Sequence, residues 1–359
     1  MTEAEEASEY KAYLLRKVIF ILVMIAGVFA LFIYSLTMGQ LDLGFFETYH
    51  YVIEHIMGAT YEPGTRDWFC DYLIFNRNMP ESVFAVIAGA YLAVAGVAMQ
   101  SVMNNPLADA YTTGISSGAC LGVAIAMILG INLISGDVGS HVGILGNAFV
   151  FSLVPMAIIL LVAKRLDQSP TSLILAGTAI SFFLNAFTMA VMLLATDQSL
   201  AAVYGWQVGS IGGTTWDDVP FMAVTSIFGI IVISLLAKKL NVMSSGENSA
   251  KALGLDIEAL RTACLLIMSL MVASVIAYAG IIGFVGLVCP HIVRTIIDAD
   301  NRYVIPASAV LGALMLIGSM VIAQLVATPT LRVPVGVVLS FVGAPLFLLL
   351  IIRRKSHVW

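Results

Sequence analysis

Long apolar stretches separated by short polar segments dominate the chain. A bilayer core about 30 Å thick requires about 20 apolar residues of helix at 1.5 Å per residue. Stretches of about this length cover residues 18–38, 82–103, 112–134, 142–163, 171–195, 219–237, 262–279, 303–327 and 335–352. A shorter, glycine-rich run, residues 281–297, contains Pro290, His291 and Arg294. Counting that run as a span, the pattern predicts an all-α integral membrane protein with about ten transmembrane helices.

Basic residues decide between nine and ten spans. With ten, the clusters at residues 11–17, 164–165, 238–261, 302 and 353–355 fall on one face. The positive-inside rule assigns that face to the cytoplasm. We therefore expect a multi-pass protein of the cell membrane with both termini cytoplasmic. Its predicted parts are a tail (1–17), a permease domain (18–352) and a second tail (353–359), with an external loop at 39–76 and a cytoplasmic loop at 241–261.

Composition excludes several other classes of protein. Hydrophobic residues make up 60% of the chain and charged residues 11%, with a net charge of -5. A soluble domain has a larger fraction of charged residues, and a polybasic nucleic-acid-binding protein has a positive net charge. The four cysteines form no CxxC pair, so neither a disulfide framework nor a zinc site is expected. His50 and His55, in the external loop, lack a third ligand at a suggestive spacing, so we predict no metal site.

The spans lack the groups that membrane enzymes and proton pumps use. No Asp, Glu, Lys or Arg occurs in residues 82–103, 112–134, 168–196 or 303–331. Charges inside spans serve pumps as proton relays, so a proton-coupled transporter is disfavoured, while a sodium site of backbone carbonyls remains open. The sequence has no H-E-x-x-H motif and no lysine preceded by glycine, which a P-loop requires. We expect no catalytic residue and no cofactor on this chain; if ATP drives it, ATP and Mg bind to another subunit.

A proline motif closes the second apolar stretch. Residues 99–109 read MQSVMNNPLAD, and a residue before proline is pushed away from helical geometry, so the helix is predicted to end at Asn105. Asn105, Pro106, Leu107 and Asp109, followed by TGISSGA, resemble the signature of FecCD-type permeases. These are the membrane subunits of ABC importers for iron chelates, haem and vitamin B12.

Three further blocks resemble that family, in the family's order. They are YGWQVGSIGGTTW at 204–216, AGIIGFVGLVCPHIVR at 279–294 and VPVGVVLSFVGAPLF at 333–347. The matching motif residues are Gly286, Pro290, His291, Arg294, Pro334, Gly336, Gly343 and Pro345. The resemblance implies a BtuC-like type II ABC importer permease: a homodimer in the lipid bilayer, with two cytoplasmic ABC ATPases and an external substrate-binding protein, and no nucleic acid.

The loop at 241–261 can be interpreted from its local helix signals or from its resemblance to the family. Ser244 and Glu247 have the spacing of a capping box, and Gly254 stands where a helix C-cap would. Short helices are predicted over about 245–253 and 256–260, which locally could be an ordinary solvated loop. The segment also resembles the family's G-E-x-x-A-x-x-L-G coupling loop. That resemblance assigns ATPase docking to Gly246, Glu247, Ala250, Leu253, Gly254 and Leu255.

Polar residues recur on one face of the fifth span. Thr178, Ser181, Asn185 and Thr188 are spaced by three and four residues, which places them on one helical face. They could form a hydrogen-bonded seam between helices or line an aqueous path, and the resemblance implies the path. The resemblance also places Ser169 and Thr171 at a cytoplasmic gate.

The chain departs from the family where the binding protein docks. The family's R-x-P-R segment reads NMPE at 78–81, with Arg77 one place earlier, and Gln324 replaces another arginine. Arg77 and Arg332 remain as external cations, so we predict that reversing both charges weakens docking.

Three functions remain after these observations. The first is inward transport of an iron chelate (ferric siderophore or haem), with cobalamin or another corrinoid as the alternative cargo. The second is an ion-coupled secondary transporter working alone. The third is a membrane enzyme using His291, a weak reading because a lone histidine near a helix break is usually structural.

Overall fold

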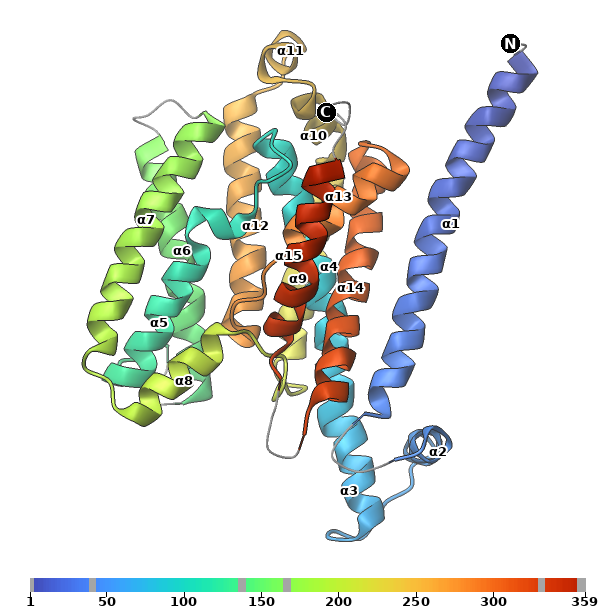
Figure 1. The fold of residues 1–359 in the computed structure, drawn as a ribbon, viewed down its shortest axis with the longest axis vertical. Coiled ribbons are helices and arrows are strands. Elements are labelled where there is room, and N and C mark those ends of the chain that lie inside the picture. The colour runs from blue at the N-terminus through green and yellow to red at the C-terminus, as the bar shows by residue number, and fades with distance from the viewer. Residues whose placement is uncertain (1–2, 39–42, 135–139, 164–168, 329–332, 354–359) are drawn as a thin grey trace.

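The computed structural model describes residues 3–38, 43–134, 140–163, 169–328 and 333–353, and within these ranges it contains helices and no strands (Figure 1). The elements are α1 (Glu3–Leu36), α2 (Phe45–Ile56), α3 (Arg66–Leu73), η1 (Ile74–Asn78), α4 (Met79–Val102), η2 (Ala110–Thr113), α5 (Ile115–Leu129), α6 (His141–Ala163), α7 (Pro170–Met192), α8 (Asp197–Gln207), α9 (Val219–Leu235), α10 (Ala237–Ser244), α11 (Glu247–Ala252), α12 (Ile257–Ala279), α13 (Val285–Ile297), α14 (Asn301–Val326) and α15 (Val335–Arg353).

The apolar helices reproduce the ten predicted spans. Six helical segments of the described chain are long and apolar enough to cross a membrane. α9 and α10 meet the same criteria of length and hydropathy when they are taken together, with a bend of 55° between them. The remaining three predicted spans are the shorter apolar helices α5, α13 and α15. The predicted all-α membrane architecture is confirmed.

Several boundaries differ from the sequence prediction. The predicted external loop contains α2 and α3, and α3 continues through the π-helical turn η1 into α4. The predicted span at 112–134 is helical only over α5, because Gly114 and Gly130 adopt left-handed φ values of +87° and +69° at its two ends. α8 was not predicted, because its sequence is neither long nor strongly apolar.

Glycines allow the central helices to approach closely. α4 lies at the centre and packs against α9, α12, α13 and α14. A Cβ added at Gly96 would overlap the carbonyl oxygen of Gly286 on α13, and one at Gly89 would overlap that of Gly312 on α14. These contacts require glycine, because small residues let helix backbones come together in a membrane.

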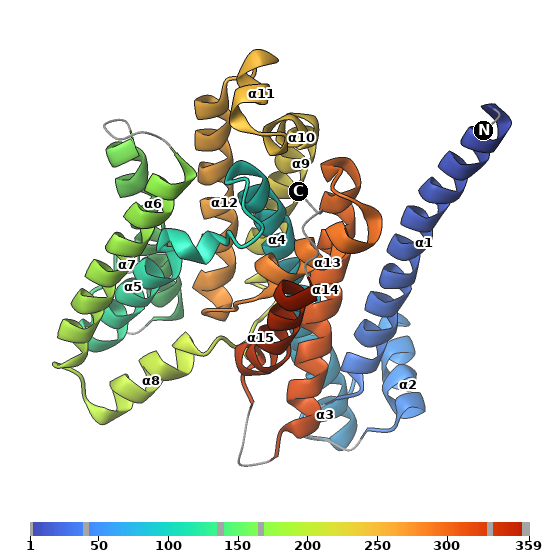
Figure 2. The same cartoon turned by 45° about the horizontal axis from the view of Figure 1, so that its top comes forward.

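The two ends of the bundle carry different features. The beginning of α1, the end of α15 and the whole of α11 lie at one end, which we call the α11 end (Figures 1 and 2). α2, α3 and α8 lie at the opposite end. α1 packs against α14 and α4, and few residues of its apolar part are fully buried.

Candidate functional site

A short helix stands at the α11 end between two glycines with positive φ. Gly246, before α11, has φ +104°, and Gly254, after it, has φ +78°. The amide of Gly254 donates to the carbonyl of Lys251 (2.9 Å), and the amide of Leu255 donates to that of Ala250 (3.0 Å). This pair of bonds is the C-terminal motif that a left-handed glycine makes possible. The helix end predicted at Gly254 is confirmed, with Leu253 as the C-cap residue and Gly254 directly after it.

The start of α11 is held differently from the prediction. Glu247 accepts a hydrogen bond from Arg261, whose side chain is buried on α12. Ser244 instead donates to the carbonyl of Leu240 (3.0 Å), and the cap position is Gly246, which makes no side-chain cap bond. The predicted Ser244–Glu247 capping box is therefore wrong, because the tertiary ion pair takes the carboxylate.

The predicted second short helix is also wrong. Asp256 accepts the amide of Ala259 (3.0 Å) and caps α12, so residues 256–260 belong to the beginning of that long helix. Ala250 is fully buried, whereas the side chain of Leu253 is 71% exposed. The α11 segment is thus a rigidly attached helix with an apolar residue turned outward.

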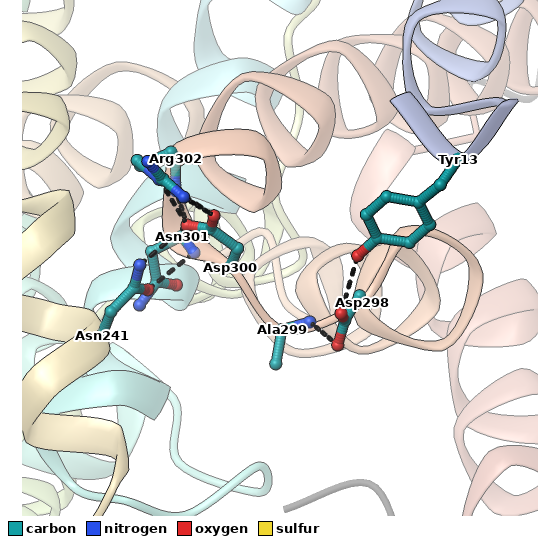
Figure 3. A network of polar contacts seen from close by, with 7 residues as sticks. All are labelled: Tyr13, Asn241, Asp298, Ala299, Asp300, Asn301 and Arg302. Carbon is teal, nitrogen blue, oxygen red and sulfur yellow. Dashed lines mark hydrogen bonds and ion pairs between the residues drawn. The ribbon is translucent and has the colours of Figure 1, made fainter. Parts of the chain in front are cut away.

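A polar network anchors α10, the helix that directly precedes α11 (Figure 3). Asn241 donates to Asp300 (2.7 Å) and accepts the amide of Asn301 (2.8 Å), which ties α10 to the start of α14. Although burial acts to raise the pKa of Asp300, hydrogen bonds from Arg302 and Asn241 lower it to about 2. Sequence reasoning missed this network, although Asp300 directly before an apolar run is a recognisable N-cap signal.

Arg294 is the centre of a second, buried network. It donates to Ser101 Oγ on α4 (3.1 Å), to Asn301 Oδ1 on α14 (3.0 Å) and to the carbonyl of Ala299 (3.1 Å). Arg294 therefore clamps three helices together. Pro290 and His291 are buried on the same helix, α13.

Three of the resemblance-bearing motifs meet where α12 ends. The chain leaves helical geometry between Gly280 (φ +69°) and Phe284 (φ +69°). The amide of Ser210 donates to the carbonyl of Ala279 (2.8 Å), and the amide of Gly336 donates to that of Gly209 (3.1 Å). Gly343 packs directly against Phe284, so that a Cβ at this glycine would collide with the ring.

An apolar cavity of about 520 Å³ borders this junction. Its lining includes Gln207, Val208, Ile281, Phe284, Ser340 and Phe341. Irregular backbone inside a membrane protein is tolerated where it is packed in protein or lines a cavity, which fits the break between α12 and α13. These lining residues lie within the sequence motifs, but nothing in the motif pattern indicates which of their side chains border a cavity.

The fourth motif forms a turn after α4. The helix ends at Val102, close to the predicted end at Asn105. Asn105 Oδ1 accepts the amide of Leu107 (3.0 Å), and the Asp109 carbonyl accepts the hydroxyl of Thr112 (2.6 Å). Pro106 is buried in the turn.

The polar stripe on α7 lies at the edge of a packed face. Thr178 and Asn185 are exposed, Ser181 is half-buried and Thr188 is buried. The hydroxyls of Thr178, Ser181 and Thr188 each donate to the carbonyl four residues earlier on α7, at 2.8–2.9 Å. These three bonds satisfy the hydroxyls within the helix, so none of the three needs a partner on a neighbouring helix.

The two predicted gate residues begin α7. Ser169 is its N-cap and accepts the amide of Ser172 (3.2 Å), with Pro170 in the first helical position. Thr171 follows with an exposed side chain. The intervening proline therefore fits the helix start and does not interrupt the segment.

At the opposite end of the bundle, Arg77 already pairs with an acidic side chain. Its Nε lies 3.6 Å from Glu81 Oε1, and Glu81 is buried and accepts the amide of Gly213 (2.9 Å). A cleft of about 140 Å³ beside them also contains Gln324. Arg332 lies outside the residues that the structure describes. His55 pairs with Asp71 (2.7 Å) and His50 lies near Glu54 (3.3 Å).

Comparison with known proteins identifies the family. The model of the FecCD transport family matches residues 25–353. The chain belongs to the FecCD transport family. The ABC transporter permease protein MJ0087 of Methanocaldococcus jannaschii is 36% identical over 358 residues, covering 98% of this chain and 99% of the relative.

Two FecCD relatives have different cargoes in their names. The Fe(3+)-citrate import system permease protein YfmD of Bacillus subtilis is 32% identical, covering 95% of this chain and 96% of the relative. The cobalamin import system permease protein BtuC of Halobacterium salinarum is 32% identical, covering 79% and 74%. A solved inward-facing structure of a metal-chelate type ABC transporter shares the fold, with a TM-score of 0.79, 24% identity and coverage of 93% and 99%.

Membership in the FecCD family settles the class of protein. The chain is an integral membrane ABC permease, a transport component and not an enzyme. The enzyme reading of His291 is thereby set aside.

Proposed function

We propose that this chain is the membrane-spanning subunit of an ATP-binding-cassette importer that moves an iron chelate, a ferric siderophore or haem, inward. The family match and the named Fe(3+)-citrate relative support this cargo class. The observation that carries the mechanism is the α11 segment, a helix clamped by Arg261 with Leu253 exposed.

In this proposal the α11 end is cytoplasmic and α11 docks into a cleft of an ABC ATPase. Gly246, Glu247, Ala250, Leu253, Gly254 and Leu255 form the coupling segment, and both termini lie on the same side. ATP and Mg bind to two partner ATPases. Because α11 is anchored to α12 through Arg261 and lies next to α10, a displacement of α11 passes directly into two membrane helices.

Two copies of the chain enclose the path. The exposed surface of α7 supports this step, because Phe182, Phe183 and Phe187 leave a large apolar face uncovered in a single subunit. In a homodimer this face packs on the partner or on lipid, and Thr178, Ser181, Asn185 and Thr188 border the path. Ser169 and Thr171, at the α11 end of α7, form the cytoplasmic gate.

The external substrate-binding protein docks at the α2–α3 end. Since Arg77 is paired with buried Glu81, it presents a partly neutralised charge to that partner. Arg332 is the second docking cation in this proposal. Exposed ion pairs contribute about 0–1 kcal/mol each, so docking depends mainly on surface shape.

A corrinoid is the second candidate cargo, because a relative of similar identity is a cobalamin import permease. Proteoliposomes containing the permease, its ATPase and its binding protein distinguish the cargoes. We expect ATP-dependent uptake of a ferric siderophore or haem, and loss of uptake when the ATPase P-loop lysine is replaced. Preferential uptake of cobalamin would show that the cargo is a corrinoid and not an iron chelate. Uptake by the permease alone, driven by an ion gradient, would refute the importer proposal.

A further inference from the structure

A crevice of about 340 Å³ opens at the α11 end, between residues 13–17 of α1 and the turn that joins α13 to α14. Its lining includes Arg16 and Lys17 from α1 and Arg294 and Thr295 from α13. Arg16 is exposed, whereas Lys17 and Arg294 are buried. Three cations therefore border one small space that the transport function does not use.

Lys17 is the unusual member of this crevice. Its side chain is only 2% exposed. The ammonium lies 4.1 Å from the ring centre of Tyr13 and 4.4 Å from that of Tyr303, and it interacts electrostatically with Asp298. Cation–π contacts compensate part of the lost hydration. An anion bound in the crevice would supply hydrogen-bond acceptors for the three N–H donors of this ammonium.

The carboxylates nearby are occupied by other donors. Asp298 accepts the hydroxyl of Tyr13 (2.7 Å) on one oxygen and the amide of Ala299 (2.7 Å) on the other (Figure 3). Asp300 is bound by Arg302 and Asn241. Among the side chains that the structure describes, the lining combines Arg16, Lys17 and Arg294 with one carboxylate, Asp298, so these residues leave an excess of positive charge.

We propose that this crevice binds the phosphate diester of an anionic phospholipid. The phosphate oxygens accept hydrogen bonds from Lys17 Nζ and from the Arg16 guanidinium, with Thr295 at the rim. Basic pockets between membrane helices are suited to such headgroups.

The position of the crevice favours a lipid over a free anion. Lys17 lies in the first turns of the apolar part of α1, Leu15–Leu36, where the hydrocarbon region begins. The outward residues that follow, Val18, Ile19 and Leu22, are each about half exposed. They provide a surface along which acyl chains can lie once the headgroup is bound. A soluble phosphate would use the cations but not this surface.

Native mass spectrometry of the full-length permease in mild detergent tests the proposal. The protein is titrated with dioleoyl phosphatidylglycerol, with dioleoyl phosphatidylcholine, and with phosphatidylglycerol in the presence of sodium phosphate. We expect one phosphatidylglycerol to be retained in preference to phosphatidylcholine and not displaced by millimolar phosphate. Each interfacial cation contributes enough to change affinity about fivefold, so Lys17→Gln and Arg16→Gln should each weaken retention by about that factor.

Matched variants separate binding from folding. Lys17→Arg keeps the charge and should retain the lipid, and Lys238→Gln removes an exposed cation on α10 outside the crevice and should bind as the wild type does. Should Lys17→Gln fail to fold, the exposed Arg16 decides the outcome. Equal retention by Arg16→Gln and wild type, equal retention of the two lipids, or displacement by phosphate would each overturn the proposal.

Discussion

The two glycines that bracket α11 allow a test in which only the backbone changes. A Cβ added at Gly246 or at Gly254 meets no atom within 4 Å, so alanine at either position introduces strain without a clash. Gly254, at φ +78°, is in the left-handed region, where alanine costs about 1 kcal/mol. Gly246, at φ +104° and ψ 148°, is in a region that is essentially restricted to glycine. We therefore expect Gly246→Ala to cost about 2 kcal/mol, more than Gly254→Ala.

Hydrogen exchange of the α11 amides measures this cost locally, because it reports the free energy of local opening. The expected acceleration is about fivefold for Gly254→Ala and about thirtyfold for Gly246→Ala, with ATP-driven uptake reduced in the same order. Gly205→Ala on α8 is the control, since it also has open space but no positive φ. Equal exchange rates in both α11 variants and the wild type would show that these backbone angles do not hold the helix in place.

Three further predictions concern the packing and the polar networks. Arg294→Lys should lower the free energy of unfolding by about 2–4 kcal/mol, because an ammonium cannot reproduce the three-way hydrogen bonding; unchanged denaturant stability would contradict the clamp. Gly96→Ala should lower the free energy of unfolding by about 3 kcal/mol because its Cβ overlaps a backbone carbonyl. Gly318→Ala, whose Cβ meets only a leucine methyl at 3.4 Å, should be tolerated, and thermal melting of the two variants compares them. The lowered pKa of Asp300, about 2, means that its stabilisation is present above the unfolded-state pKa of about 3.9 and is lost as pH falls towards 2; Asp300→Asn should remove that part of the acid sensitivity in melting curves, and an unaltered pH profile would refute it.

Hydropathy and basic-residue placement were sufficient to predict the ten spans, because both follow from the energetics of the bilayer itself. They could not predict α8, whose residues are not strongly apolar, or the helical content of the external loop. α3 continues through the π-helical turn η1 into α4 although Pro80 stands at the start of α4, so the proline marks a change of helical hydrogen bonding and not an end of the helix.

The candidate site was predictable where the signal is local. The cap at Gly254 depends on the conformation of one residue and its neighbours, so spacing alone located it. The Ser244–Glu247 box failed because Arg261, fourteen positions later, competes for the carboxylate, and such a contact exists only in the folded chain. The crevice beside Lys17 could not be predicted from the sequence either, because Lys17 and Tyr303 meet only after α1 packs on α14.

The clamp around Arg294 has a consequence for how the protein is made. α13 has 13 residues, about 20 Å of helix, which is shorter than the hydrocarbon core, and its buried Arg294 finds its partners on α4 and α14. Such a segment is a poor substrate for the translocon by itself. We therefore expect its lateral release into lipid to follow the synthesis of Asn301 on the next helix, so that the two segments enter the bilayer together as a hairpin.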